Sequence, residues 1–308
     1  MMKRPFFPAL RLRRAPGLRA LSLCAVLLAA ACAGNPNPAP PPAPPAAIPA
    51  RGGTGARRLV FIGLDGWGGA YVSKADMPRV KGMIARGAST FKARAVLPTV
   101  SWPNWSSLFS GAAPEIREGR GDFPSLFTVL KNHPGKAGGA VLFYEWEPLA
   151  GLCDDAAAEK RRIRSTAESA REVAAYIREK KPVFTAVVFD EPDGTGHEKR
   201  WGSRAYYRRL NEMDGYIGLI EDAVKEAGIY DETVFVISAD HGGSFWGHGH
   251  NLPKQRAIPL IIRGRGVKEG FTIPPPVSIC DIAPTMAAIL GLEIPGEWTG
   301  RPLGDLFQ

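Results

Sequence analysis

Cysteine is scarce in this chain of 308 residues: there are four, and none belongs to a CxxC pair. Cysteine zinc sites are built from such closely spaced pairs, so the sequence argues against a zinc-finger or zinc-ribbon site. After Cys32 only Cys153 and Cys280 remain. A disulfide between these two would suit an oxidising compartment, but the sequence does not require one.

Acidic residues are absent from the first 31 positions, which carry six lysines and arginines. The whole chain has 39 basic and 30 acidic residues, a formal net charge of +9. Without the leader, 33 basic residues face 30 acidic ones, a net charge of +3. The remainder is only mildly basic and has no basic stripe interleaved with aromatic residues, so nucleic-acid binding is not indicated.

No apolar run in the leader is long enough to span a membrane comfortably. Leu18 to Ala31 is apolar, short, and preceded by positive charge, which predicts a signal peptide over residues 1–31. Its end, Leu28-Ala-Ala-Ala-Cys32, resembles a bacterial lipoprotein box, with Ala29 where leucine is usual. We therefore expect export to a bacterial cell envelope and a periplasm-facing lipid anchor on Cys32; ordinary signal cleavage is the alternative.

Residues 32–56 form a proline-rich segment, with eight prolines between Pro36 and Pro49. Such a segment has little to bury and favours extended polyproline II, so we interpret it as a linker. The remaining residues, 57–308, are numerous enough for one large domain with its own core.

Within 57–308, short apolar runs alternate with helical patterns. The runs predict strands at 59–64, 140–143, 183–189, 233–237 and 259–262. Helices are expected over 154–181, over 203–228 and from Asp281 onward, because apolar residues recur there at helical spacing or the composition favours helix. Nearly continuous apolar strands between helices are typical of an α/β/α sandwich of three layers around a mostly parallel sheet.

Histidine is also scarce, and three of the five histidines fall between positions 241 and 250. Aspartates and histidines follow three of the predicted strands, and the carboxyl ends of parallel strands share one edge of a sheet. They are Asp65, Asp193, His197, Asp240, His241 and His248. Such nitrogen and oxygen ligands suit zinc or a similar divalent ion, so the pattern predicts a site for two metal ions. The alternatives are a surface loop that binds metal adventitiously and aspartates that only cap helices.

Another loop carries the candidate nucleophile. Ser101 precedes a helix-like run from Trp105 to Phe109, so its hydroxyl is expected at a helix N-terminus, where free backbone N–H groups attract anions such as phosphate. An N-cap serine without catalytic function would show the same pattern.

Four motifs, in this order, resemble the alkaline phosphatase superfamily, and within it the type I phosphodiesterase/nucleotide pyrophosphatase family. They are Phe61-Ile-Gly-Leu-Asp65-Gly, Pro98-Thr-Val-Ser101-Trp-Pro-Asn104, Glu191-Pro-Asp193-Gly-Thr-Gly-His197 and Ser238-Ala-Asp240-His241-Gly-Gly. The resemblance spans roughly residues 57–303. It implies an alkaline-phosphatase-like fold in a compact bacterial member.

The resemblance also implies the roles of single residues. One zinc-like ion would be held by Asp193, His197 and a later histidine, for which we prefer His248 to His250. The other ion would be held by Asp65, Asp240, His241 and the oxygen of Ser101. Ser101 matches the nucleophile, and Asn104 matches the residue that holds a phosphate oxygen together with a backbone amide.

The expected activity is metal-dependent hydrolysis of phosphoric esters through a phosphoserine intermediate, on diester or nucleotide pyrophosphate bonds of a small substrate. The short stretch between Gly111 and Lys181 leaves room for only a small cap, which puts the nucleotide specificity of larger relatives in doubt. The alternatives are a phosphomonoesterase, a sulfatase and a non-enzymatic lipoprotein that binds a surface partner. A sulfatase is disfavoured because Trp105 stands where its motif has arginine and Gly66 follows Asp65.

Overall fold

The computed structural model describes residues 55–114, 123–133, 139–153 and 157–308. The predicted signal peptide and most of the predicted linker, including Cys32, lie outside the described residues. Among the described residues, no helix combines the length and apolar composition that crossing a membrane requires.

Eight strands form one sheet in the order β4-β3-β5-β1-β6-β7-β2-β8. They are β1 (Arg58–Leu64), β2 (Ala88–Arg94), β3 (Ala140–Tyr144), β4 (Glu159–Arg162), β5 (Phe184–Phe189), β6 (Thr233–Ser238), β7 (Ala257–Gly264) and β8 (Phe271–Thr272). β7 pairs antiparallel with both of its neighbours, β6 and β2, and the other pairings are parallel. The expected mostly parallel sheet is confirmed.

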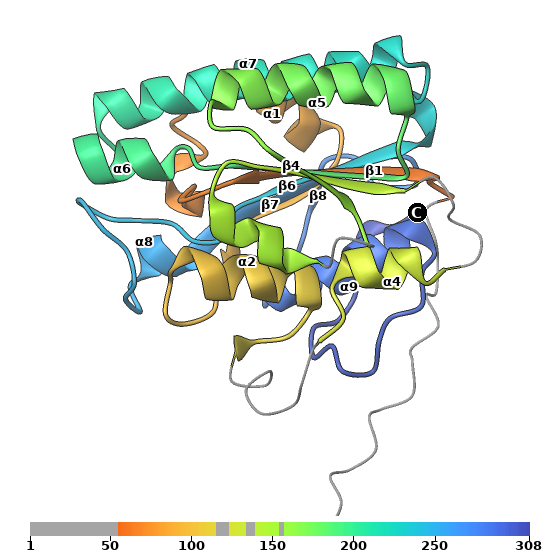
Figure 1. Ribbon diagram of the computed structural model, residues 1–308. Helices are drawn as coiled ribbons and strands as arrows, with labels where there is room; N and C mark the ends of the chain where they lie inside the picture. Colours follow the sequence, from red (N-terminus) through yellow and green to blue (C-terminus); the bar gives the residue numbers. More distant parts are fainter. Residues whose placement is uncertain (1–54, 115–122, 134–138, 154–156) are drawn as a thin grey trace, which may run out of the picture. The chain divides into compact units, whose positions relative to one another are not determined.

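Helices cover both faces of the sheet, as Figure 1 shows. One face carries α1 (Pro78–Ala85), α5 (Thr166–Lys180) and α7 (Arg204–Glu226), and the other carries α2 (Ser101–Ser110), α4 (Leu126–Lys131) and α9 (Ile282–Leu290). Strands β1, β3, β5 and β6 are buried almost throughout because helices lie over both of their faces. The three-layer α/β/α sandwich is therefore confirmed.

One expected helix begins later than its composition indicated. The run 154–181 was expected to be helical, yet α5 begins at Thr166 and Glu159–Arg162 forms β4. β4 lies at the edge of the sheet and pairs with β3 alone, so its charged side chains can stay in water. Within the described part of 111–181, the chain builds strands and helices of the sandwich and no separate cap.

Cys153 and Cys280 are both buried and carry thiols, so the disulfide that the sequence left open is not formed.

Candidate metal centre

The register of the central strands brings the site residues to one edge of the sheet. Leu64 of β1 pairs with Phe189 of β5, and Gly63 pairs with Ser238 of β6. These three strands therefore end at nearly the same level. Asp65 follows β1 directly, Asp240 follows β6 after one residue, and α6 (Asp193–Lys199) begins shortly after β5. Parallel pairing thus gathers side chains that are up to 175 positions apart in the sequence.

Asp65, Asp240 and His241 form the first ligand group, and all three are buried. The Nε2 atom of His241 lies 3.2 Å from Asp240 Oδ2 and 3.5 Å from Asp65 Oδ1. The other Asp240 oxygen, Oδ1, accepts hydrogen bonds from the backbone N–H of Gly66 (3.1 Å) and of His241 (2.8 Å). These bonds fix one carboxylate oxygen of Asp240 and aim the other at the group.

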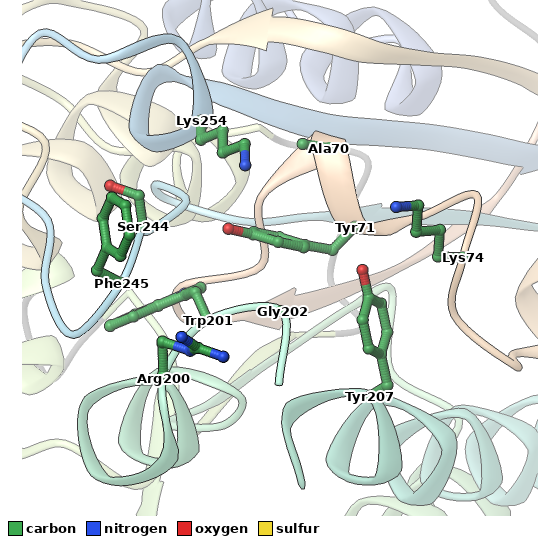
Figure 2. A pocket seen from close by; sticks show the side chains of 10 residues that line it. All are labelled: Ala70, Tyr71, Lys74, Arg200, Trp201, Gly202, Tyr207, Ser244, Phe245 and Lys254. Atoms are coloured by element: carbon green, nitrogen blue, oxygen red, sulfur yellow. The ribbon is translucent and has the colours of Figure 1, made fainter. Parts of the chain in front are cut away.

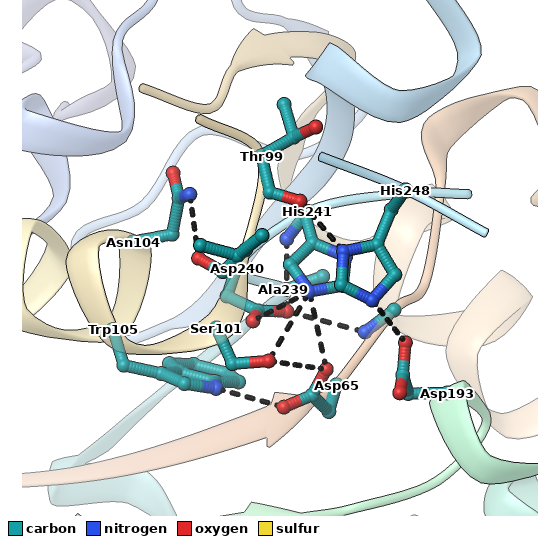
Figure 3. Close-up of polar contacts among 12 residues, drawn as sticks. Asp65, Thr99, Ser101, Asn104, Trp105, Asp193, Ala239, Asp240, His241 and His248 are labelled. Atoms are coloured by element: carbon teal, nitrogen blue, oxygen red, sulfur yellow. Dashed lines mark hydrogen bonds and ion pairs between the residues drawn. The ribbon is translucent and has the colours of Figure 1, made fainter. Parts of the chain in front are cut away.

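Asp193, His197 and His248 form the second ligand group. Asp193 and His197 lie one turn apart on α6, with 3.4 Å between Asp193 Oδ2 and His197 Nε2. His248 comes from the loop after β6, and its Nε2 lies 3.0 Å from His197 Nε2 and 3.6 Å from Asp193 Oδ1. The rings of His241 and His248 stack with centroids 3.9 Å apart, which places the two groups side by side (Figure 3).

All three imidazoles are oriented in the same way. Each Nδ1 lies within hydrogen-bond distance of a backbone carbonyl: Trp246 for His197 (3.0 Å), Gly242 for His241 (3.1 Å) and Thr99 for His248 (2.7 Å). A carbonyl can only accept, so each Nδ1 must carry the proton. The Nε2 lone pairs are therefore left facing the two groups, which is the arrangement that metal-binding histidines adopt.

The electrostatics of the two groups call for positive charge. Burial raises the pKa of Asp65 well above its ordinary value, and the carboxylates of Asp240 and Asp193 raise it further. Burial likewise raises the pKa of Asp193 to about 7 and that of Asp240 to about 7. Burial lowers the pKa of His241 to about 3, and burial together with His241 lowers that of His248 to about 4. Neutral imidazoles therefore face carboxylates whose ionisation lacks a compensating cation.

Two buried carboxylate oxygens add a geometric argument. Asp193 Oδ1 and Asp240 Oδ2 have no hydrogen-bond donor among the described residues, although buried polar atoms are nearly always paired. One such oxygen belongs to each ligand group. A divalent ion in each group would satisfy the oxygen and favour the ionised carboxylates. The residues present fit such ions.

Ser101 lies at the first position of α2 and adjoins the first ligand group. Its Oγ is 3.2 Å from His241 Nε2 and 3.4 Å from Asp65 Oδ1. The first-turn N–H groups of an α-helix have no partner inside the helix, so the start of α2 favours an anion beside Ser101. Trp105, one turn further on, donates its ring N–H to Asp65 Oδ2 at 3.1 Å and fixes that carboxylate (Figure 3).

Asn104 does not join the site in the way that the sequence predicted. Its side chain is fully buried, and its Oδ1 accepts from the backbone N–H of Val96 at 2.8 Å. Its Nδ2 donates to the carbonyls of Val100 (2.9 Å) and Pro98 (3.1 Å). The amide is thus engaged by the backbone of 96–100, and the expectation that it holds a phosphate oxygen is not supported by its geometry. Asn104 instead shapes the loop that presents Ser101.

The loop that carries His248 is held by two residues that the sequence analysis missed. Thr99 accepts the N–H of Gly249 at its Oγ1 (2.9 Å) and donates the same hydroxyl to the carbonyl of His250 (3.0 Å). Gln255 accepts the N–H of His250 at 2.8 Å. The exposed His250 thereby contributes backbone groups to the loop, while His248 enters the ligand group. No sequence pattern marks Gln255, whereas Thr99 lies within the motif that contains Ser101.

Trp201 was also missed, although it packs against the second ligand group. Its indole meets the ring of His197 edge-on with centroids 4.9 Å apart and lies 5.9 Å from that of His248. A Cβ on either Gly196 or Gly243 would overlap with the indole. These glycines were visible in the sequence next to His197 and His241, and close approach of a bulky ring is one reason for a glycine at such a place.

Comparison with known families matches residues 59–117 and 136–253, more than half of the chain, to the type I phosphodiesterase/nucleotide pyrophosphatase family. The matched ranges contain every candidate ligand and Ser101.

The curated relatives include proteins named as a sulfatase and as a phosphate transferase. Arylsulfatase K of Danio rerio is 33% identical over 108 residues, 33% of this chain and 21% of that protein. GPI ethanolamine phosphate transferase 1 of Aspergillus fumigatus is 30% identical over 164 residues, 46% of this chain and 16% of that protein. The match therefore spans about a fifth or less of the length of these relatives.

Among solved structures, the murine ectonucleotide pyrophosphatase/phosphodiesterase 5, an inactive variant in complex with AMP, has a similar fold. The TM-score is 0.66 at 13% identity, with 82% of this chain and 100% of that chain covered. At this identity, the likeness supports the fold alone.

Proposed function

The chain belongs to the type I phosphodiesterase/nucleotide pyrophosphatase family, and on this basis we propose that it hydrolyses phosphoric esters with the help of two divalent metal ions. We infer that its substrates are small molecules with a phosphodiester or pyrophosphate bond, of which nucleotide-like esters are the leading class. The solved structure of the murine relative holds AMP, a nucleoside monophosphate of the kind that hydrolysis of a nucleotide diester or pyrophosphate would release.

One observation carries the proposal: the hydroxyl of Ser101 adjoins the first ligand group at the start of a helix. The distances of 3.2 Å to His241 Nε2 and 3.4 Å to Asp65 Oδ1 place Oγ where it can join these two side chains around one ion. A phosphate group in front of Oγ would also meet the first-turn N–H groups of α2. Nucleophile and anion site thus coincide.

We propose that Asp65, Asp240 and His241 hold one ion and that Asp193, His197 and His248 hold the other. Imidazole and carboxylate ligands suit zinc. Bound ions would lower the pKa of a neighbouring hydroxyl and stabilise negative charge on the leaving oxygen.

Ser101 would then attack phosphorus in line with the leaving group. The O–H bond of Ser101 breaks and its proton passes to water, a bond from Oγ to phosphorus forms, the bond from phosphorus to the leaving oxygen breaks, and the leaving oxygen departs with the electron pair. Water attacks the phosphoserine from the opposite side and releases Ser101. Each step inverts phosphorus, so the complete reaction proceeds with retention of configuration.

The neighbours of Ser101 favour a diester over a monoester. No arginine or lysine within the described residues hydrogen-bonds to Ser101 or to the six proposed ligands. A monoester dianion would gain from such a positive neighbour, whereas a diester or pyrophosphate group carries less charge at the reacting phosphorus. Phosphomonoesterase activity is therefore the second candidate.

Sulfatase activity is disfavoured by two positions. Gly66 has a φ of +72°, and a Cβ there would lie 2.7 Å from Asp193 Oδ1 and 2.9 Å from Asp193 Cα. A second aspartate after Asp65 would therefore not fit without movement of Asp193. Trp105 stands in place of the arginine of the sulfatase motif, and its ring N–H is directed at Asp65.

An apolar rim supports an organic substrate. Within the described residues, the exposed large hydrophobic side chains lie at the start of α2, in the loop before it and in the loop around His248, and they are Leu97, Trp102, Phe245, Trp246 and Leu252. Trp102 follows Ser101 directly and is 40% exposed. An exposed indole beside the nucleophile could stack on a planar ring of the substrate, such as a nucleobase.

The test is turnover of four nitrophenyl compounds by the purified, metal-loaded protein: nitrophenyl phosphate, bis-nitrophenyl phosphate, a nucleotide nitrophenyl ester and nitrophenyl sulfate. We expect the two diesters to be the best substrates. Ser101→Ala should reduce turnover by roughly 1000-fold or more, because the nucleophile is lost, while both ions stay bound. Ser73→Ala, which changes an exposed serine away from the site, is the control.

A preference for nitrophenyl phosphate would select the phosphomonoesterase, and a preference for the sulfate would select the sulfatase. Full activity of Ser101→Ala would reject Ser101 as nucleophile. A chiral phosphorothioate diester converted with inversion would reject the covalent intermediate independently of any substitution.

We further propose that the protein is exported and tethered through a lipid on Cys32, with residues 32–56 as the spacer. Cys32→Ser should move the protein from the membrane fraction to the soluble fraction of the cell envelope. Ordinary cleavage is the correct interpretation if the wild-type protein is already soluble there.

A further inference from the structure

A cavity of about 350 Å³ lies between the loop that follows β6 and the segments around Tyr71 and Trp201. We call it the basic pocket, because Lys74, Arg200 and Lys254 line it. Figure 2 shows Lys74 and Lys254 on one side of the Tyr71 ring and Arg200 beside Trp201 on the other. None of the six proposed metal ligands lines this cavity.

The charge of the basic pocket is of one sign. No carboxylate is among its lining residues. None of the three cations has a salt bridge among the residues that the structure describes. Three cations that share a concave surface without a counter-charge raise the local potential and attract anions.

The walls of the basic pocket are aromatic. Tyr71 and Trp201 are buried, and Tyr207 and Phe245 complete the lining. The Tyr71 hydroxyl donates to the carbonyl of Gly243 at 2.8 Å, which holds the Tyr71 ring against the loop after β6. Aromatic faces beside lysine and arginine suit a ligand that joins a planar ring to an anionic group.

Two lining residues have an unusual backbone. Arg200 has a φ of +75° and Phe245 a φ of +55°, and only one other non-glycine residue in the described ranges, Lys181, has a positive φ. The backbone N–H of Trp201 donates to the carbonyl of Phe245 at 2.8 Å and joins the two strained segments. A positive φ is unfavourable for any residue other than glycine, and residues held in this conformation often lie at binding sites.

Trp201 connects the basic pocket to the metal centre. The same indole that lines the pocket contacts the rings of His197 and His248. Its Nε1 donates to the carbonyl of Gly66 at 2.9 Å, so Trp201 is fixed to the segment after Asp65 as well. A ligand in the pocket would therefore press on a side chain that supports the second ligand group.

We propose that the basic pocket is a second binding site, separate from the metal centre, for an organic anion that carries a planar ring. Sulfonate, sulfate, phosphate and carboxylate groups share the required chemistry. The proposal does not depend on ester hydrolysis.

The probe is naphthalene-2-sulfonate, a planar monoanion and a weak metal ligand. Its binding to the purified, metal-loaded protein is measured by calorimetry. We expect one saturable site, weakened by roughly tenfold in each of Lys74→Gln and Lys254→Gln and by more in the double variant, because each removes a charged contact. Lys131→Gln is the matched control, because Lys131 is an exposed residue of α4 that does not line the basic pocket. This variant should bind the probe as the wild type does.

Trp102→Ala distinguishes binding in the basic pocket from binding at the apolar rim around Ser101. It should leave the affinity for naphthalene-2-sulfonate unchanged. The proposal is overturned if the double variant binds as tightly as the wild type, if Trp102→Ala alone abolishes binding, or if no saturable binding occurs up to roughly 10 mM.

Inhibition kinetics with the best nitrophenyl substrate then identify the source of the natural anion. Competition by the probe that is lost in the double variant indicates a second anionic end of the substrate. Non-competitive behaviour indicates a separate effector. Either result supports the site, and binding remains measurable even if no substrate is hydrolysed.

Discussion

Single residues of the candidate metal centre are oriented by backbone groups. The Nδ1 atoms of His197, His241 and His248 each face a carbonyl oxygen, and Asp240 is held by two backbone N–H groups. Side chains fixed in this way lose little conformational entropy when an ion arrives. The backbone thus sets the positions of these side chains, whereas the crowding of the Asp65, Asp193 and Asp240 carboxylates still calls for positive charge.

Asn104 gives the first prediction, because its amide makes bonds to three backbone groups of 96–100. Asn104→Ala should lower the free energy of unfolding by about 2 to 3 kcal/mol, since it removes three hydrogen bonds between a buried amide and part-buried backbone groups. Activity should fall with the loss of order around Ser101. Urea unfolding and turnover are measured on the same preparation.

The control is Asn211→Ala on α7, whose amide donates to Asp76 at an exposed position. Its effect on stability should stay within about 0.5 kcal/mol. Unchanged stability of Asn104→Ala together with a large loss of turnover would restore the role in phosphate binding that the sequence predicted.

At the scale of elements, the loop between β6 and β7 determines where His248 lies in the second ligand group. Gln255 of α8 (Pro253–Arg256) is almost fully buried and accepts from His250 at 2.8 Å. Its Nε2 donates to Ser244 Oγ (3.0 Å) and to the Gly247 carbonyl (3.2 Å). One side chain therefore closes the loop on both sides of His248.

Gln255→Leu is the second prediction. Leucine has a similar volume but cannot form these bonds, so the loop should loosen. The affinity of the group formed by Asp193, His197 and His248 for its ion should then fall by about 10- to 100-fold. The ion at Asp65, Asp240 and His241 should stay bound. Metal content is measured against a competing chelator, with Gln255→Glu, which keeps the acceptor, as the intermediate case. Equal loss of both ions would contradict a role confined to this loop.

Elements that are buried on both faces could be predicted from the sequence, and the edges could not. β1, β5 and β6 were evident as apolar runs because helices cover both sides of them. β2 and β4 contain many polar residues, since a sheet edge or a partly open face leaves those side chains in water, and β8 has only two residues. β4 therefore resembled the start of the helix that follows it.

The residues of the site also divide into those that could be predicted from the sequence and those that could not. The strand-end residues from Asp65 to His248 were found, since their chemistry is visible in the residue types, and the structure brings them together in two groups. Residues that act through shape or through the backbone were missed or misassigned, among them Trp201, Gln255 and Asn104. The contacts of Trp201 come partly from tertiary packing, and the hydrogen bonds of Asn104 and Gln255 come from irregular loops close to them in sequence. Neither kind of contact leaves a periodic pattern in one sequence.

For the molecule as a whole, Glu145 links stability to pH. It follows β3, and its Oε2 accepts from the Asp190 N–H (3.0 Å) and from Thr166 Oγ1 (3.1 Å). The buried Oε1 has no partner within the described residues. Burial raises the pKa of Glu145 from 4.5 to about 7. Between these values the folded protein holds a proton that the unfolded chain releases, so this carboxyl destabilises the fold progressively as pH rises from 4.5 through 7.

Glu145→Gln should remove this dependence. The amide oxygen can accept the same two hydrogen bonds, and the NH₂ group replaces the unpartnered oxygen. Relative to the wild type, the variant should gain about 2 to 3 kcal/mol in free energy of unfolding between pH 4.5 and pH 8. Urea unfolding across this range, at a fixed metal concentration, measures the difference. Glu293→Gln, at an exposed position, should give a curve parallel to that of the wild type. Parallel curves for Glu145→Gln as well would mean that Glu145 is ionised in the folded protein at neutral pH, and that its burial is compensated by a cation.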